Sequence, residues 1–297
     1  MPPRPYRRPT SLLVKALLWA AAAAVMVGSM VYQRLTGPTH PRRGAFAMAG
    51  ATHAYKVSRS GDSGQDERIA LPDPGHGVTG VLRYRRFRTA DPFTSVPLRA
   101  EDHRGRKELA ALLPRQPAAG KLEYVLRLEG PGGPVTVPPE GGAIVIRFKD
   151  HVPAPLLVAH VAMMFLGVMV GVRAGLAAVA GASDMASQAW ATLACLTAGG
   201  LVLGPFVQKH AFGAYWTGFP FGGDLTDNKT VLMWGAWALA CAVLWAARRG
   251  PARVAVALAS AAMLGVYLIP HSARGSELDY SKVDRGMTGP AAIQTGR

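Results

Sequence analysis

Long apolar stretches divide the chain into parts that suit lipid and a part that suits water. A helix that crosses a membrane needs about 20 predominantly apolar residues. Five stretches qualify or nearly qualify, and they comprise residues 11–31, 154–173, 189–207, 231–247 and 253–270. Residues 32–152 between the first two are polar, basic and rich in Pro and Gly. The pattern predicts an all-α membrane bundle of about five helices, the last four within 153–270, with a water-exposed domain inserted between helices one and two.

Basic residues at the ends of these stretches predict how they cross the membrane. Loops that stay in the cytoplasm carry an excess of Lys and Arg. The N-terminal residues are basic and hold no acidic residue, the second stretch ends at Arg173, and Arg248 and Arg249 follow the fourth. We therefore expect a bacterial cytoplasmic (inner) membrane protein with its N-terminus inside. The polar domain, the loop 208–230 and the tail 271–297 are then expected outside, on the periplasmic side.

Residues 1–31 also have the basic start and apolar run of a secretory signal peptide. The run is long for a signal peptide, and the candidate cleavage site at 47–49 lies well past its end. We interpret 1–31 as an uncleaved anchor helix with a cytoplasmic N-terminus. The topology of the remaining chain is the same under either interpretation.

Short alternating runs in the polar domain predict β structure. From about residue 65, such runs are separated by Pro-Gly, Gly-Gly and Asp-Pro pairs, which mark turns. The predicted strands are 66–71, 79–87, 93–99, 107–113, 120–129, 133–138 and 143–149. Short strands at this spacing indicate an all-β sandwich over 65–152. Residues 32–64 show no apolar periodicity, and we interpret them as a linker.

The stretch from Leu113 to Leu128 joins a Pro- and Gly-containing turn to a strand that bears Tyr124. It resembles the late strands of fibronectin type III and immunoglobulin-like domains, in which such a turn leads into a strand with a corner tyrosine. The resemblance implies that the Tyr124 ring packs in the core while its hydroxyl bonds back to the turn backbone. It also implies a domain that binds or spaces rather than one that catalyses.

The net charge of +15 does not by itself indicate a nucleic-acid-binding protein. The run 83–88 mixes Arg with Tyr and Phe, as nucleic-acid interfaces do. On a strand, however, alternation sends these Arg side chains to a solvated face, and part of the excess follows from membrane topology. We expect the lipid bilayer and an envelope protein as partners, and no nucleic acid. Cys195 and Cys241 both lie in apolar stretches, so we expect no disulfide in the β domain.

Three histidines are predicted to gather at the outer face of the bundle. His160 lies within the second stretch, while His210 ends the third and His271 ends the fifth. An ionisable side chain inside a span is costly and faces the bundle interior as a rule. One interpretation is a site for haem b, or for a transition metal with Asp224 or Asp227 as further ligands. The other is a neutral, hydrogen-bonded His160, with the remaining two histidines as polar helix ends.

The loop that precedes the fourth predicted helix is unusually aromatic. The side chains expected to lie at a membrane interface, and offered as candidates for partner binding, are Tyr215, Trp216, Phe219 and Phe221. An acidic stretch follows, in which Thr226 or Asp227 is expected to cap the first turn of the helix. The loop therefore predicts an interfacial segment that ends in a capped helix.

Three stretches, 204–210, 224–230 and 269–280, together resemble a group of uncharacterised bacterial inner-membrane proteins. The resemblance covers most of residues 75–282 and supports the architecture, but it implies no activity. The sequence contains no phosphate-binding loop, dinucleotide fingerprint, zinc-protease motif or serine-hydrolase elbow. We therefore expect a non-catalytic membrane component whose β domain binds or positions a partner in an envelope complex. A membrane redox subunit and a small transporter are the alternatives.

Overall fold

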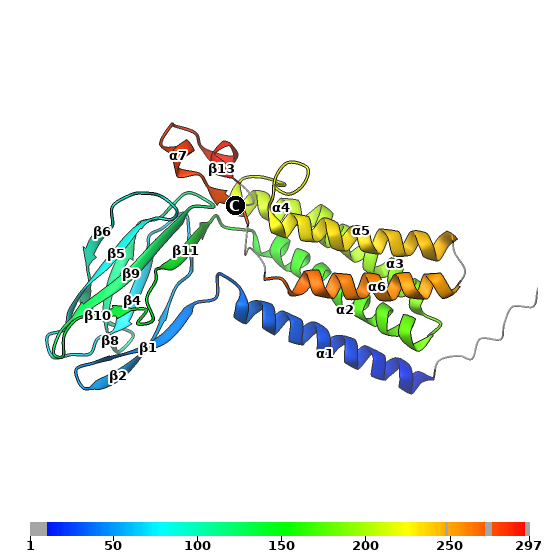
Figure 1. Cartoon of the computed structure of the whole chain (residues 1–297), viewed down its shortest axis with the longest axis horizontal. Coiled ribbons are helices and arrows are strands. Elements are labelled where there is room, and N and C mark those ends of the chain that lie inside the picture. The colour runs from blue at the N-terminus through cyan, green and yellow to red at the C-terminus, as the bar shows by residue number, and fades with distance from the viewer. Residues whose placement is uncertain (1–10, 247–248, 271–274, 295–297) are drawn as a thin grey trace, which may run out of the picture.

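The computed structural model describes residues 11–246, 249–270 and 275–294. It consists of a helical bundle and a β domain joined end to end, with a C-terminal segment lying over their junction (Figure 1). We call the end of the bundle beside the β domain the domain end, and the opposite end the far end. His271 and Arg248 lie outside the described residues.

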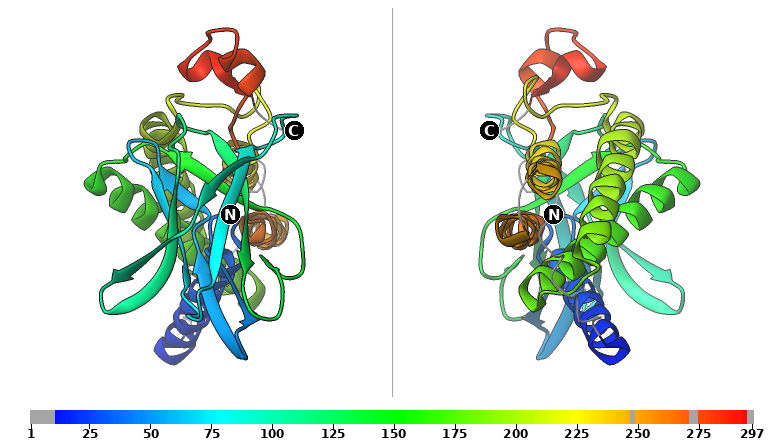
Figure 2. Two further views of the ribbon diagram at one scale, coloured as in Figure 1. Left: turned by 90° about the vertical axis from the view of Figure 1, so that its left-hand side faces the viewer. Right: turned by 90° about the vertical axis from the view of Figure 1, so that its right-hand side faces the viewer.

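Within the described residues, five helical paths are long and apolar enough to cross a membrane, as predicted. The helices are α1 (Leu12–Thr36), α2 (Ala154–Ala180), α3 (Met185–Leu196), the π-helix η1 (Thr197–Leu203), α4 (Gly204–Phe212), α5 (Leu225–Ala246) and α6 (Arg249–Leu268), with the short α7 (Tyr280–Val283) and the 3-10 turn η2 (Gly289–Ala292) in the C-terminal segment. The third path comprises α3, η1 and α4, which follow one another without a break. Helix α2 packs against α1, α3 and α6, and α1 lies at one edge of the bundle (Figure 2).

The β domain follows α1 and occupies residues 42–149. Its strands are β1 (Arg42–Met48), β2 (Ala51–Val57), β3 (Ser60–Asp62), β4 (Glu67–Pro72), β5 (Thr79–Arg86), β6 (Thr94–Pro97), β7 (Arg99–His103), β8 (Arg106–Leu113), β9 (Lys121–Glu129), β10 (Val135–Val137) and β11 (Ile144–Lys149). One sheet has the order β3-β11-β9-β5-β6 with β10 beside β9, another has the order β4-β8-β7, and β1 pairs with β2. Ile69 and Leu113 of the second sheet share a fully buried core with Leu82 and Leu126 of the first.

The hairpin of β1 and β2 corrects the prediction that residues 32–64 form a linker. Its inward side chains, which join the domain core, are Phe46, Met48, Tyr55 and Val57. Ala49 and Gly50 form the two-residue turn, and both have positive φ angles, as the tight hairpin turn requires. This hairpin is hard to recognise in the sequence because its alternate residues are mostly small or polar and because Ala-Gly is a weak turn signal.

The spans begin and end at different residues from those predicted. Arg173 was expected to end its helix, but α2 continues to Ala180. The Arg173 side chain is fully buried, and its Nη2 donates to Asp184 Oδ2 at 2.8 Å. A charge paired within the bundle therefore does not mark where the helix ends.

Tyr124 lies in the core as predicted, with none of its surface exposed. Its hydroxyl, however, donates to the carbonyl of Ser58, at 2.7 Å, and not to the turn before β9. The tyrosine that bonds to that turn is Tyr280, from α7. Its hydroxyl accepts from the backbone N–H of Lys121 at 3.0 Å and lies 3.0 Å from Gln116 Oε1. The corner interaction is thus made by a residue outside the β domain.

Candidate functional site

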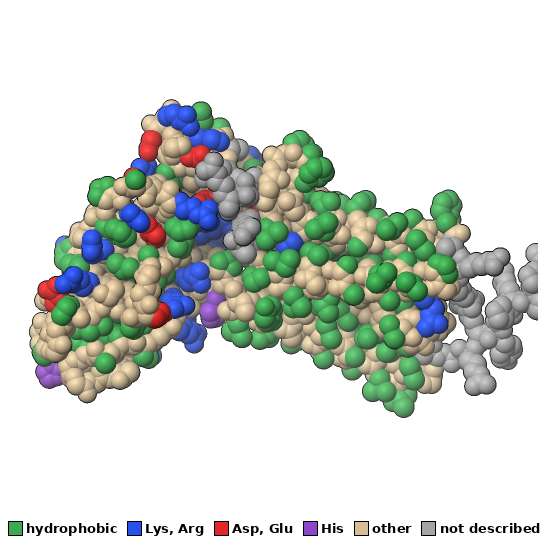
Figure 3. Space-filling view, in the orientation of Figure 1, with side chains coloured by type: hydrophobic (Ala, Val, Ile, Leu, Met, Phe, Trp, Pro, Cys, Tyr) green, Lys and Arg blue, Asp and Glu red, His purple; other side chains and the backbone are tan. Residues whose placement is uncertain are grey.

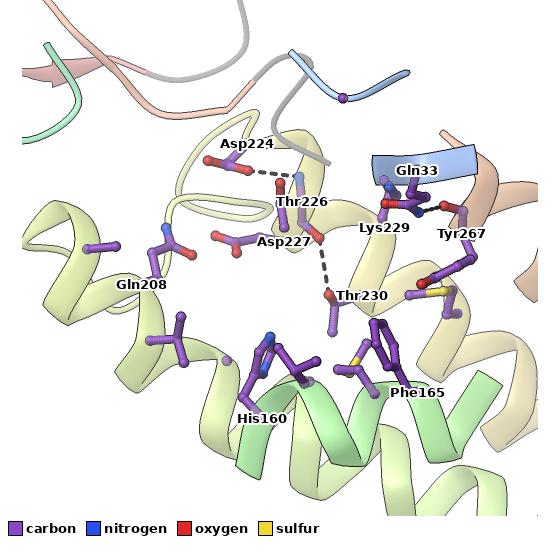
Figure 4. Close-up of a pocket in the computed structure, with 18 of the residues that line it drawn as sticks. Gln33, His160, Phe165, Gln208, Asp224, Thr226, Asp227, Lys229, Thr230 and Tyr267 are labelled. Atoms are coloured by element: carbon purple, nitrogen blue, oxygen red, sulfur yellow. Dashed lines mark hydrogen bonds between the residues drawn. The ribbon is translucent and has the colours of Figure 1, made fainter. Parts of the chain in front are cut away.

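A cavity of about 500 Å³ lies at the domain end of the bundle. Its walls come from α1, α2, η1, α4, α5 and α6, and Arg147 of β11 contributes from the β domain. His160, Asp227 and Gln208 project toward its centre (Figure 4). The cavity therefore exists only because five helical paths and the β domain meet there.

The cavity wall changes character along the bundle axis. Arg34 and Lys229 lie on it near the domain end, at the end of α1 and the start of α5. Met30 and Met233 lie on it one turn deeper along the same two helices. Phe165, about three turns into α2, adds to the apolar wall. The cavity is thus polar at the domain end and apolar toward the middle of the bundle.

The two carboxylates of the cavity wall are occupied by backbone donors. Asp227 Oδ2 accepts from the N–H groups of Thr217 and Gly218 at 2.6 and 2.9 Å. Asp224 Oδ2 accepts from the N–H of Ser276 at 2.7 Å, and its Oδ1 accepts from the N–H of Thr226 at 2.8 Å. Asp224 therefore caps α5 in place of the predicted Thr226 or Asp227, and the two carboxylates tie the aromatic loop and the C-terminal segment to the bundle.

Arg147 is the residue of the β domain that reaches the cavity. Its side chain is buried, lies 4.1 Å from the ring centre of Phe212, and donates through Nη2 to the carbonyl of Ser276 at 2.7 Å. Its Nε is buried without a hydrogen-bond partner. Burial lowers the pKa of the guanidinium to about 10, and the nearby carboxylates of Asp224 and Glu277 act in the opposite direction.

Lys229 is the second buried cation of the wall, with only 3% of its surface exposed. Its ammonium donates to the carbonyl of Ile269, just beyond α6, and forms no ion pair among the described residues. Gln33 of α1 donates through its side-chain amide to the carbonyl of Tyr267 on α6. These donors satisfy carbonyls at the C-terminal end of α6, where a positive charge is favourable, and they link α1 and α5 to it.

His160 of α2 lies on the cavity wall, beside the π-helix η1. Its Nδ1 lies 2.8 Å from the carbonyl oxygen of Gly199. Because that oxygen can only accept, Nδ1 carries the proton. Gly199 O also accepts from the N–H of Gly204 in the π-helical pattern. The His160 ring thus ties α2 to η1, which is the arrangement expected of a hydrogen-bonded histidine inside a bundle.

The structure brings together some of the predicted site residues and separates others. His160, Asp224 and Asp227 line the cavity, whereas His210 is exposed and lies off its wall. His271 is outside the described residues. Among those described, no three His, Cys, Asp or Glu side chains are grouped so that they could hold a metal ion. Only some of the residues predicted to bind haem or a metal therefore lie close together.

The aromatic loop presents most of its predicted residues at the surface. Phe219 and Phe221 are the most exposed, at 71% and 82%. Trp216 donates through its indole nitrogen to the carbonyl of Phe219 at 3.0 Å. Tyr215 packs edge-on against Phe206, with ring centres 5.7 Å apart. The loop is thus folded on itself, with two phenylalanines projecting outward.

The C-terminal segment, residues 275–294, belongs to the tail that is predicted on the outer side, but its contacts with the β domain were not predicted. Strand β12 (Glu277–Leu278) pairs with β13 (Ile293–Gln294), and Glu277 forms an ion pair with Lys121 at 2.6 Å. Burial lowers the pKa of Lys121, against the raising effect of Glu277. The acidic and aromatic character of this segment was visible in the sequence, but nothing local indicated its partners.

Comparisons with known proteins do not assign the site. No family model, curated protein or solved structure matches the chain. The function therefore has to be argued from the geometry of the bundle, the β domain and their junction.

Proposed function

We propose that the protein is an integral membrane protein whose bundle holds the β domain in one fixed orientation. It acts as a non-catalytic component that presents this domain to a protein partner in the cell envelope. The observation that carries the proposal is the C-terminal segment, which leaves α6 and bonds along the β domain. A tether would need only a flexible link, whereas this segment fixes the angle between the two parts.

Three groups of contacts support a fixed orientation. Tyr280 bonds to the turn before β9, and its burial raises the pKa of its hydroxyl, which keeps it neutral as a donor. Arg86 of β5 forms an ion pair with Asp284 at 2.6 Å. The backbone N–H of Asp150 donates to the carbonyl of Ala211 at the end of α4 at 3.0 Å. Together these contacts restrain the β domain at several separate points.

The surface of the bundle supports its placement in lipid. Apolar side chains cover the visible face of the bundle, whereas charged side chains gather on the β domain (Figure 3). The large apolar side chains that are exposed on the helices include Leu13, Leu17, Val158, Val179, Val202, Leu232, Leu239 and Leu258. Exposed apolar area of this extent is typical of a protein–lipid interface.

Basic residues support a cytoplasmic far end. Lys15 lies at the start of α1, and Arg253 of α6 donates through Nε to the carbonyl of Ala178 at 2.7 Å. With the positive-inside rule, the β domain then faces the periplasm of a bacterial inner membrane. We also interpret the two larger sheets and their shared core as a sandwich of the fibronectin type III or immunoglobulin kind.

The hydrogen bonds that the polar side chains already make favour this function over that of a redox subunit. Asp224 and Asp227 accept bonds that hold the loop and the tail, and His160 donates to a backbone carbonyl. These side chains are engaged in maintaining the junction. Transport is a weaker alternative for the same reason, since the buried carboxylates at the domain end hold the loop and the C-terminal segment in place.

Accessibility of single cysteines tests the topology. Cys195 and Cys241 are buried, so they give little background labelling. Ser95 on β6 and Ser187 on α3 are both exposed. In spheroplasts, a membrane-impermeant maleimide is expected to label Ser95→Cys, and to label Ser187→Cys only after permeabilisation. The opposite pattern would overturn the orientation, and labelling of both without permeabilisation would overturn the membrane assignment.

Spin labels on the same two positions test the fixed orientation. The double variant Ser95→Cys/Ser187→Cys is expected to give one narrow distance distribution by pulsed electron paramagnetic resonance. A broad distribution would show that the bundle is a mere tether. A photo-crosslinking residue at Leu112, an exposed apolar side chain of β8, then tests for the partner. We expect one discrete protein adduct in native membranes, and its absence would count against the presenting role.

A further inference from the structure

We propose that the cavity at the domain end binds an anionic amphiphile, a molecule with an acyl chain and one acidic headgroup. The headgroup would lie near Arg147 and Lys229, and the chain would lie against the apolar wall deeper in the bundle. The proposal needs only the cavity, so it can fail while the β-domain function stands, and the reverse also holds.

The charges of the wall favour an anionic ligand. The cavity is lined by three cationic side chains, Arg34, Arg147 and Lys229, and by two carboxylates, Asp224 and Asp227. Both carboxylates are already surrounded by N–H donors from the loop and the C-terminal segment. The positive side chains are less well compensated, so a single negative charge would complete the site.

The hydrogen bonds lead to the same conclusion. Among the described residues of the wall, the buried polar atom that has no partner is a donor, Arg147 Nε. Lys229 has three donor hydrogens, and among the described residues its ammonium donates to the carbonyl of Ile269 and to no other acceptor. A buried donor without an acceptor loses its bonds to water on folding and gains none in return, which destabilises the folded state. A carboxylate or phosphate oxygen supplies the missing acceptors with charge-assisted bonds.

The shape and polarity of the cavity select an amphiphile over a free ion. A volume of about 500 Å³ is in the range of small-molecule sites and is too large for a lone anion. Below Lys229 and Arg34 the wall continues with Met30, Phe165 and Met233. Methionine side chains adapt readily to flexible chains. A ligand that satisfies both halves must therefore carry a charge at one end and a hydrocarbon at the other.

Two sources of this chemistry are available to a membrane protein, a free fatty acid and an anionic phospholipid. Titrations of the full-length protein in nanodiscs separate them. Oleate is compared with oleyl alcohol, and phosphatidylglycerol with phosphatidylcholine, so that each pair differs in charge. We expect saturable binding of at least one anionic member, about 10-fold tighter than its neutral counterpart. Native mass spectrometry then identifies which of the two is retained.

Matched lysine variants locate the headgroup. Lys229→Met keeps the length of the side chain and removes the charge, and we expect it to weaken the anionic ligand by about 10-fold or more. Lys209→Met is the control, because Lys209 also donates to a backbone carbonyl, that of Gly213 at 2.8 Å, but is exposed and lies off the cavity wall. It is expected to leave binding unchanged.

A second variant keeps the test decisive if Lys229→Met does not fold. Arg34 is an exposed cation on the wall, so Arg34→Gln should fold and should weaken binding by a few-fold. Thermal melting in detergent verifies the fold of each variant. Equal affinity for the charged and neutral members of both pairs overturns the proposal. So does unchanged anion binding in a folded Lys229→Met protein, or in Arg34→Gln if the lysine variant is lost.

Discussion

The two ends of the bundle each bury an arginine near an aromatic ring, but they complete its bonding differently. At the far end, Arg173 lies 5.7 Å from the ring centre of Trp19 and pairs with Asp184. The Nε and Nη1 atoms of Arg173 have no hydrogen-bond partner, but two acceptors of the same cluster, Asp184 Oδ1 and Gln188 Oε1, have none either. At the domain end, Arg147 donates through Nη2 to the carbonyl of Ser276, but its Nε has no acceptor. No buried side-chain acceptor among the described residues of the cavity wall is left without a donor.

Packing differs between the two ends in the same sense. In the far half, Gly175 lets α2 approach α6 so closely that an added Cβ would overlap with the side chain of Ser260. At the domain end, residues of the same two helices line the cavity. The far end is therefore closed by contacts within the bundle. The domain end is stabilised by the loop and the tail, and it retains both space and unused donors.

The largest expected effect comes from breaking the polar pair at the far end. Asp184→Asn leaves the fully buried Arg173 without a counter-charge, which costs about 3–5 kcal/mol in such pairs. Unfolding in mixed detergent micelles measures the loss. The double variant Arg173→Met/Asp184→Asn removes both charges and should recover most of it. If Asp184→Asn alone were neutral, the far end would not depend on this pair.

Close packing at the far end is tested by the next largest effect. Gly175→Ala places a methyl group against Ser260 and should destabilise the bundle by about 1–3 kcal/mol. Gly235→Ala in α5 is the matched control, because no atom lies within 4 Å of its added Cβ. It should be neutral or slightly stabilising. Equal melting temperatures for the two variants would argue against tight α2–α6 packing.

The junction is tested by a smaller effect. Tyr280→Phe removes the hydroxyl that accepts from the Lys121 N–H, and it should weaken the attachment of the C-terminal segment by about 1–2 kcal/mol. Hydrogen exchange of residues 277–284 is expected to become faster while exchange in the bundle stays the same. Met287→Ala, which shortens an exposed side chain of the same C-terminal segment, serves as the control. Unchanged exchange in Tyr280→Phe would mean that the segment is held mainly by other contacts.

The smallest expected effect is a loss of stability at acidic pH. Arg86 hydrogen-bonds to Asp91 and so lowers the pKa of that carboxyl below its ordinary value of 3.8. A carboxyl whose pKa is depressed on folding stabilises the folded state above about pH 3.8, and the contribution is lost as the pH falls through the lower folded value. We therefore expect a slight loss of stability below pH 4. Arg86→Gln should flatten this pH dependence, and a persistent slope in that variant would assign it to other carboxyls.

Local patterns were sufficient for much of the architecture. A helix in lipid must be apolar along its length, and a half-buried strand must alternate, so both can be recognised within a few turns or residues. This is why the five helical paths and most strands from β4 to β11 lie close to their predicted positions, whereas β7 (Arg99–His103) follows the predicted strand 93–99 and was not predicted. The hairpin of β1 and β2 was missed because Ala, Thr and His weaken its alternation.

The candidate site was decided by contacts between distant parts of the chain. Lys121 and Tyr280 are 159 residues apart, and no local pattern indicates that Tyr280, and not Tyr124, bonds to the turn. The sequence likewise identified Asp224 and Asp227 as polar residues of one loop. Only the tertiary structure shows that backbone donors already surround both carboxylates. Whether a buried charge is compensated depends on which groups the fold places beside it, and this is why the cavity and its unsatisfied donors emerge only from the assembled molecule.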